Sequence, residues 1–273
     1  AIKFQTHIAK HEMLDTKITL AHSKKETVFD LMKKCEMTLN QHIKLKKYCD
    51  KKKIIFLSTP FSTQAADLLK KVNVPAFKIG SGECNNFPLI EHIAKMRKPT
   101  IISTGMNSIN SVDATYKFAK KFNKQIILMH CISMYPAPSN KSMLDTITFF
   151  KKRFKCPVGF SDHSDDINLA IAAVALGANI IEKHFTVSKK WSGPDIGLSI
   201  TPDKFGLMVK ACKEIFSAKG IRDKVLKEEK PVTKFAFASV VTIKTIKKNG
   251  LLFITATPNS HNLNFRLSKK AYN

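Results

Sequence analysis

One segment of the chain, residues 157–195, constrains the fold more than any other part of the sequence. It opens with an apolar strand pattern that ends in the polar run SDH at 161–163, and it continues through an apolar helix pattern at 167–177. A second strand pattern follows and ends in EKH at 182–184. A strand–helix–strand unit of this kind joins parallel strands, whose carboxyl ends meet at one edge of a sheet. Open α/β sheets and barrels bind ligands at that edge, so we expect the chemistry of the protein there.

The same alternation of strand and helix patterns runs along most of the chain. Strand patterns are predicted at residues 1–6, 54–60, 76–82, 99–105, 125–132, 157–162 and 179–184. Helix patterns are predicted at residues 27–53, 62–72, 87–96, 111–122, 143–154, 167–177 and 202–218, with a loop at 7–25. This order indicates a parallel α/β sheet, either doubly wound or closed as a barrel. Because a (β/α)8 TIM barrel needs eight strands and about 250 residues, we expect a barrel whose first strand and helix precede Ala1.

The character of the sequence changes after Gly220. We expect residues 1–220 to form the barrel domain and the charged residues 221–234 to form a linker. The run FAFASVV at 235–241 alternates like a strand, whereas residues 251–273 show little periodicity. Residues 235–273 are therefore predicted to be the incomplete start of a small second domain.

The charge of the chain is strongly positive, with 46 Lys+Arg against 21 Asp+Glu and a formal net charge of +25. Such a balance suits nucleic acid or an acidic membrane surface. The lysines, however, are spread in pairs along the whole chain, without a basic arm or an aromatic-studded basic motif. A lysine-biased genome explains them equally well, so no nucleic-acid partner is predicted. A basic binding protein without catalysis stays open as an alternative of a different class.

The six cysteines are dispersed, and no two of them have CxxC spacing. This pattern argues against a structural zinc site and against a disulfide framework. We therefore expect reduced thiols and a cytoplasmic location. No apolar run approaches the roughly 20 residues that a membrane span requires, so no membrane association is predicted.

Polar side chains gather at the carboxyl ends of successive predicted strands. They are Lys3 and Gln5, Ser58 and Thr59, Lys78, Ser81 and Glu83, Ser103 and Thr104, Tyr135, and finally His163 and His184. Hydroxyls combined with two fixed positive charges are what a phosphate or carboxylate ligand needs, so Lys3 and Lys78 favour an anionic ligand. Two imidazoles, one from each strand end, suit a borderline divalent cation such as Mn²⁺ or Zn²⁺ with open positions for water and substrate.

Other polar residues near these strand ends have less specific interpretations. Strand alternation is expected to direct Asp162 and Glu182 away from the histidines, in supporting or structural roles. His130 lies in the middle of a predicted strand and is expected to be a hydrogen-bonded core histidine. Asp195 is expected on a loop over the site, where it would bind a hydroxylated ligand, while Trp191 on that loop serves either packing or function.

Nine motifs, taken in order, resemble one family. They are KFQ, STPF, KIGSGECNNFPLI, IISTGM, MHC followed by YPAP, GFSDH, AAVALGA, IEKHFT and GPD. This series resembles the sialic acid synthases, the phosphoenolpyruvate-condensing N-acetylneuraminate, legionaminate and related nonulosonate synthases. The resemblance extends from Ala1 to Val241. It implies a (β/α)8 barrel followed by a small C-terminal antifreeze-like domain, exchanged across a homodimer.

The resemblance also implies roles for individual residues. His163 and His184 would hold a divalent metal, Mn²⁺ or Mg²⁺, and Glu83 would be a candidate acid/base residue. The residues that would bind phosphoenolpyruvate are Lys3, Thr59, Lys78, Ser81, Ser103 and Ser161. The residues that would line the acylated hexosamine are Gln5, Tyr135 and Asp195.

The implied reaction is the condensation of phosphoenolpyruvate with N-acetylmannosamine or a 2,4-diacetamido hexose, with release of phosphate. The sequence does not distinguish between these sugars. Two alternatives stay open. One is a Schiff-base aldolase on the same barrel that uses Lys78 or Lys183. The other is an inactive fragment, because the family's first strand would precede Ala1 and residues 251–273 do not follow the family pattern.

Overall fold

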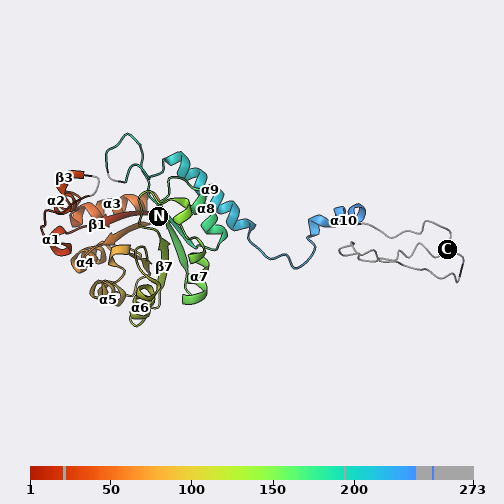
Figure 1. Cartoon of the computed structure of the whole chain (residues 1–273), viewed down its shortest axis with the longest axis horizontal. Coiled ribbons are helices and arrows are strands. Elements are labelled where there is room, and N and C mark those ends of the chain that lie inside the picture. The colour runs from red at the N-terminus through yellow and green to blue at the C-terminus, as the bar shows by residue number, and fades with distance from the viewer. Residues whose placement is uncertain (21–22, 194, 238–247, 249–273) are drawn as a thin grey trace. The chain divides into compact units, whose positions relative to one another are not determined.

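The computed structural model describes residues 1–20, 23–193, 195–237 and 248. The chain divides into two compact units, Ala1–Lys219 and Gly220–Asn273. In the first unit, strands and helices alternate along the chain as predicted, and the helices lie around the outside of the strands (Figure 1). This unit is therefore an α/β structure.

Parallel strands form the centre of the first unit. Five of them are hydrogen-bonded in the order β5 (Phe77–Ile79), β6 (Thr100–Ser103), β7 (Ile126–Cys131), β8 (Val158–Asp162) and β9 (Ile180–Lys183). A separate parallel pair joins β1 (Ile2–Thr6) to β4 (Phe56–Pro60), and β4 in turn contacts β5. Each strand thus lies beside the next parallel strand in the chain, so the carboxyl ends of all of them share one edge.

The sheet is strongly curled. Strands β5 and β9 are the two edges of the five-stranded sheet, yet the Lys78 ammonium on β5 donates hydrogen bonds to both Glu182 carboxylate oxygens on β9, at 3.0 and 3.1 Å. Side chains of opposite edge strands can meet in this way only if the intervening strands bend around them. The inner face of the curl is therefore polar at its carboxyl end.

The helices that cover the strands are α3 (Leu39–Lys51), α4 (Thr63–Val72), α5 (Phe87–Lys95), α6 (Ile109–Lys120), α7 (Asp145–Phe154), α8 (Asn168–Ala175) and α9 (Pro202–Ala218). Helices α3 to α6 begin at a residue whose side chain caps the helix, whereas α7, α8 and α9 begin without a side-chain cap. The side chains of Thr38, Ser62 and Ser108 each accept a hydrogen bond from the backbone N–H three residues later. These bonds satisfy amide groups that have no partner inside a helix, which stabilises each start.

The apolar core lies between the strands and the helices. Leu69 and Ile93 from the helices and Phe77 from β5 are fully buried in one continuous cluster with Ile102 and Leu128 from the sheet. This packing leaves the carboxyl edge of the strands free for polar residues, because the apolar side chains face the helices.

The chain before β4 differs from its prediction. Residues 7–25 were expected to form a loop, but they contain α1 (Ala9–Glu12) and an antiparallel hairpin of β2 (Thr19–Leu20) and β3 (Ser23–Thr27). The helix predicted over 27–53 is two helices, α2 (Val28–Lys34) and α3. A capping box between Thr38 and Gln41 starts α3 anew, which explains the break. The hairpin was missed because its polar sequence lacks an apolar alternation.

The second unit is described to Phe237 and at Lys248. A 3-10 turn at Lys227–Glu229 and helix α10 (Lys230–Ala236) occupy much of the predicted linker. The strand predicted from Phe235 is wrong at its first two residues, because Pro231 in the first turn of α10 favours a helix. Residues 238–241 lie outside the described residues, and the proposed start of a second domain stays a prediction.

Two further observations concern the predictions made from composition. Over the described parts of the chain, no helix is both long and apolar enough to cross a membrane. All six cysteines are free thiols in the described structure.

Gly159 on β8 is predicted to be required for close packing against β9. A Cβ at Gly159 would lie 2.9 Å from the Ile180 carbonyl oxygen and 2.8 Å from Met129 Cε. Gly159→Ala should therefore lower the free energy of unfolding by about 1–3 kcal/mol.

Gly206 on α9 is the matched control, since a Cβ there meets no atom within 4 Å. Gly206→Ala should raise the free energy of unfolding by about 0.5–1 kcal/mol. Urea unfolding followed by circular dichroism measures both, and equal stability of the two variants would contradict the close contact.

Candidate active site

A cavity of about 1040 Å³ opens at the carboxyl edge of the strands. The residues that the resemblance assigned to binding or catalysis line it, with the exception of Glu83, namely Lys3, Gln5, Thr59, Lys78, Ser81, Ser103, Tyr135, Ser161, His163, His184 and Asp195. Ser58 and Thr104, also expected at the strand ends, do not line it. These residues come from β1, β4, β5, β6 and β8 and from the segments that follow β5, β7, β8 and β9. The structure thus brings the predicted residues together, while their roles in binding and catalysis stay predictions.

Several lining residues were not predicted. They are Glu26, Leu31, Phe61, Met106, Cys131, Ser133 and Glu182, while Gly80 and Gly82 after β5 and Ser192 and Gly193 beside Asp195 also line the cavity. Phe61 follows β4 directly, and Ser133 lies two residues after β7, so both obey the strand-end rule that identified the others. Glu26 and Leu31 come from the segment around β3 and α2, where no sequence pattern pointed to the cavity.

The two histidines face each other, with ring centroids 5.3 Å apart. His163 Nδ1–H donates to the Ile132 carbonyl oxygen at 2.7 Å, which leaves Nε2 as the nitrogen with a free lone pair. Burial lowers the pKa of both His163 and His184. Neutral imidazoles are the form that binds metals, and a backbone carbonyl on the second nitrogen is a common orienting partner.

The residues present fit a divalent cation that takes two ligands from the protein and the others from water and substrate. His184 Nδ1 lies 3.6 Å from Asp195 Oδ2, and no three His, Cys, Asp or Glu side chains in the described structure converge as a metal site. The residues that would hold such a cation are therefore His163 and His184 alone. The cavity beside them has room for water and substrate to complete the coordination of a divalent ion.

Glu182 is the main correction to the predicted site. It was expected to point away from the histidines, but it lines the cavity and pairs with both lysines. Besides the Lys78 hydrogen bonds, Lys3 Nζ lies 3.6 Å from Glu182 Oε2, and Ser161 Oγ–H donates to Oε1 at 2.9 Å. Residues two apart on a strand share a face, so the strand rule itself places Glu182 with His184.

The electrostatics of this cluster are dominated by the lysine pair. Burial alone would raise the pKa of Glu182, but the charges of Lys78 and Lys3 and the hydrogen bonds from Lys78 and Ser161 outweigh burial and lower it to about 2. Burial and the charge of Lys78 lower the pKa of Lys3. Two lysines share one carboxylate, so the cluster holds an excess positive charge that suits an anionic ligand.

Hydroxyl groups near the lysines are arranged around the backbone of Gly105. The Gly105 N–H donates to Ser81 Oγ at 3.1 Å, and Ser81 Oγ lies 3.0 Å from Cys131 Sγ. A Cβ at Gly105 would lie 2.4 Å from Ser133 Oγ and 2.7 Å from Cys131 Sγ, so a larger residue there would displace these side chains. Thr59 adds a buried hydroxyl for which the described structure supplies no hydrogen-bond partner. A buried donor of this kind is costly unless a ligand or water satisfies it.

Of the acidic and aromatic residues near the cavity, Tyr135 lines it, whereas Glu83 and Asp162 do not. Glu83 accepts a hydrogen bond from Asn86 Nδ2 at 2.6 Å and does not line the cavity. Asp162 points away, as predicted, and pairs with the fully buried Lys183 at 2.9 Å. Tyr135 stacks on His163 with ring centroids 4.4 Å apart, and burial raises its pKa to about 12.

The structure also shows where His130 and Trp191 lie. His130 is buried, and its Nε2 donates to the Ser142 carbonyl oxygen at 2.8 Å, which confirms a core role. Trp191 is 59% exposed and is not among the residues that line the cavity.

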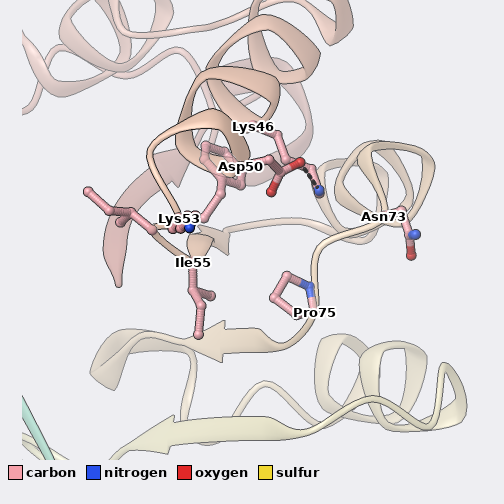
Figure 2. Close-up of a pocket in the computed structure, with 8 residues that line it drawn as sticks. Lys46, Asp50, Lys53, Ile55, Asn73 and Pro75 are labelled. Carbon is pink, nitrogen blue, oxygen red and sulfur yellow. Dashed lines mark hydrogen bonds and ion pairs between the residues drawn. The ribbon is translucent and has the colours of Figure 1, made fainter.

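A second hollow, of about 350 Å³, lies at the amino ends of β4 and β5 (Figure 2). Its lining residues are Lys46, Asp50, Lys53, Ile54, Ile55, Phe56, Asn73 and Pro75. The Lys46 ammonium donates to Asp50 at 2.7 Å, as Figure 2 shows, so the only acid of this hollow already has a partner. The convergence of charged and ligating groups occurs at the opposite edge of the sheet, which identifies the larger cavity as the candidate active site.

Comparisons with known proteins agree with this arrangement. Residues 1–224 match the NeuB family. The chain is 37% identical to the N,N'-diacetyllegionaminic acid synthase of Campylobacter jejuni subsp. jejuni serotype O:2, over 90% of this chain and 77% of that protein. It is 33% identical to the N-acetylneuraminate-9-phosphate synthase of Homo sapiens, over 78% of this chain and 60% of that protein.

A solved structure shows the same fold. It is the N-acetylneuraminic acid (sialic acid) synthetase of Leptospira borgpetersenii serovar Hardjo-bovis in complex with citrate, with a TM-score of 0.77 and 30% identity. The match covers 86% of this chain and 80% of that one. The sequence match over most of the chain and the shared fold confirm what the ordered motifs indicated, and we conclude that this chain belongs to the NeuB family.

Proposed function

We propose that this protein condenses phosphoenolpyruvate with an N-acylated amino hexose to form a nine-carbon sugar acid, with release of phosphate. The observation that carries the proposal is the convergence of Lys3, Lys78, His163 and His184 in one cavity. The relatives are synthases of legionaminic acid and of N-acetylneuraminate 9-phosphate, which supports the same class of product. The sugar is N-acetylmannosamine or a 2,4-diacetamido hexose.

The lysine side of the cavity suits phosphoenolpyruvate. This substrate carries a phosphate and a carboxylate, and Lys3 and Lys78 present two ammonium groups that share one counter-ion, Glu182. The hydroxyls of Thr59, Ser81, Ser103 and Ser161 are the proposed hydrogen-bond donors to its oxygens. The unpartnered Thr59 hydroxyl supports this assignment, because a ligand oxygen would satisfy it.

The histidine side of the cavity suits the sugar aldehyde. His163 and His184 are the proposed ligands of a divalent cation, Mn²⁺ or Mg²⁺, and Gln5, Tyr135 and Asp195 are the proposed contacts of the acylated sugar. When bound, the cation supplies Lewis-acid polarisation of the aldehyde oxygen.

The proposed reaction forms one carbon–carbon bond. The C3 carbon of phosphoenolpyruvate attacks the sugar aldehyde carbon, water adds at C2, and cleavage of the C2–O bond releases phosphate. Throughout these steps the two lysines hold the negative charge of phosphate and carboxylate in a preorganised field. Glu83, the acid/base candidate from the resemblance, lies outside the cavity lining, and its role stays a prediction.

A Schiff-base aldolase is disfavoured by the same contacts. The Lys183 ammonium is fully buried and donates to Asp162 and to Ser164 Oγ, at 2.9 and 3.3 Å. Lys78 donates to both oxygens of Glu182. A nucleophilic amine needs a free lone pair, and both lysines are held as ammonium donors in ion pairs.

The remaining features of the resemblance are part of the same proposal. We propose that the curled sheet is the larger part of a (β/α)8 barrel, since in the described structure no strand pairs with the outer edge of β1 or of β9. A homodimer, a cytoplasmic location and a C-terminal antifreeze-like domain stay predictions.

Phosphate release tests the proposed function directly. The protein is mixed with phosphoenolpyruvate, Mn²⁺ and either N-acetylmannosamine or a 2,4-diacetamido hexose, and phosphate is measured. Turnover is expected with one of these sugars, to be lost in EDTA and restored by excess Mn²⁺. His163→Ala and His184→Ala should abolish turnover while circular dichroism stays unchanged. The absence of phosphate release with every sugar would overturn the synthase, and polyanion binding alone would favour the non-catalytic alternative.

Substitution of Lys78 tests the electrostatic role of the lysine pair. Lys78→Met should lower kcat/KM by about 100-fold or more, because it removes a preorganised positive charge from the phosphate-bearing substrate. Lys70→Met, which changes an exposed lysine on α4, should leave kcat/KM within about twofold, as surface substitutions normally do. Covalent trapping of a carbonyl substrate by borohydride, lost in Lys78→Met, would instead establish the aldolase.

A further inference from the structure

The segment that follows β6, residues 104–107, forms a strained turn at the cavity. The Asn107 N–H donates to the Thr104 carbonyl oxygen at 3.3 Å, and Met106 has a φ of 62°. A positive φ at the third residue is the pattern of a type II turn, where glycine or asparagine is favoured. Met106 is 75% exposed and lines the cavity. A residue with a side chain keeps such a conformation only where its surroundings fix it, so the contacts of this turn need an explanation.

The side chain of Asn107 supplies those contacts. Its Nδ2 group donates to the Gly105 carbonyl oxygen at 2.7 Å and to the Ser81 carbonyl oxygen at 3.0 Å. Both partners are backbone carbonyls, which can only accept, so they fix which way the amide points. Its Oδ1 accepts from the Ser111 hydroxyl at 3.0 Å. One side chain therefore joins the turn to the segment after β5 and to the first turn of α6.

The residues on either side of Asn107 are anchored independently. The Thr104 N–H and hydroxyl both donate to the Met129 carbonyl oxygen on β7, at 3.0 and 3.2 Å. Ser108 caps α6 by accepting from the Ser111 N–H at 3.3 Å. Asn107 thus belongs to a rigid corner between β6 and α6, and this corner is the support to which Ser81 is bonded.

The Ser81 hydroxyl is the group that this corner positions. Ser81 Oγ accepts from the Gly105 N–H at 3.1 Å, so its own hydrogen is left to be donated elsewhere. In the described structure its other partner is Cys131 Sγ at 3.0 Å, and sulfur is a weak acceptor. An anionic oxygen in the cavity is a much stronger acceptor. The Ser81 hydroxyl is therefore set to donate to an anion, from a position that Asn107 holds.

We propose that Asn107 is a positioning residue for the anion side of the cavity. By bonding to the Ser81 and Gly105 carbonyl oxygens, it holds the Ser81 hydroxyl where that group donates to a phosphate or carboxylate oxygen of phosphoenolpyruvate. Asn107 is not among the residues that line the cavity, so it acts through Ser81. The identity of the ligand rests on the proposed function, whereas the position of Ser81 rests on the contacts of Asn107.

Binding of phosphoenolpyruvate to matched variants tests this role. Asn107→Leu keeps a branched side chain and adds no charge, but it removes both donated hydrogen bonds. Asn123→Leu is the control, because Asn123 is buried and its Nδ2 donates to the Lys98 carbonyl oxygen at 2.7 Å, before the amino end of β6. In isothermal titration calorimetry without sugar, the Kd for phosphoenolpyruvate should rise about tenfold in Asn107→Leu, the effect of one lost hydrogen bond, and stay within about twofold in Asn123→Leu.

Urea unfolding separates positioning from a merely structural role. Both variants lose amide-to-carbonyl hydrogen bonds, so both should unfold at lower urea than the wild type, while only Asn107→Leu should bind phosphoenolpyruvate more weakly. An unchanged Kd in Asn107→Leu, or an equal rise in both variants, would overturn the inference. If Asn107→Leu does not fold, Asn107→Ala removes the same bonds with a smaller side chain and is judged by the same criterion.

The binding measurement also keeps this inference distinct from the proposed function. Wild-type protein that binds phosphoenolpyruvate but releases no phosphate with any sugar would overturn the proposed function alone, since the variants are compared by binding. Wild-type protein that binds no phosphoenolpyruvate would overturn both. Wild-type turnover combined with an unchanged Kd in Asn107→Leu would overturn the positioning role alone.

Discussion

One carboxylate, that of Glu182, connects three strands that are far apart in the sequence. It accepts hydrogen bonds from Lys78 on β5 and pairs with Lys3 on β1, while its own strand, β9, is at the opposite edge of the five-stranded sheet. Removing the Glu182 carboxylate would leave the Lys3 and Lys78 ammonium groups without their shared counter-ion. The curl of the sheet makes this contact possible, and the position of the lysines and the charge of the cavity depend on it.

The division between the apolar and polar parts of the first unit follows from the same geometry. Apolar side chains of the strands face the covering helices and form one core, so the inner face at the carboxyl edge is available for charged groups. Ion pairs and hydrogen bonds satisfy most of these groups, with the Thr59 hydroxyl as an exception in the described structure. The cavity is thus built for a ligand with acceptor oxygens near the lysines, and the histidines offer two neutral nitrogens on the other side.

Residues behind the cavity extend this organisation. Lys183 and Asp162 form a buried pair that joins β8 to β9 just outside the site, and His7 with Glu12 forms a second pair behind Gln5. The first pair has no open side and stabilises the strands. The second pair reaches a side chain of the cavity wall, because His7 Nε2 lies 3.2 Å from Gln5 Oε1.

The sequence by itself determined the order of most strands and helices, the edge at which the candidate site lies and most of the lining residues that carry a charge or an imidazole, with Glu26 and Glu182 as exceptions. These features follow from local periodicity and from the rule that parallel strands end together, so no long-range contact is needed to infer them. The hairpin at Thr19–Thr27 was missed because its polar residues carry no periodic signal, and the break before α3 depends on one capping box. Only the tertiary structure decided that Glu182 joins both lysines, that Glu83 lies outside the cavity lining and that His7 faces Gln5. Such pairings depend on how far the sheet curls, because the curl decides which side chains of distant strands come within hydrogen-bond distance. Packing sets those distances, and sequence spacing does not reveal them.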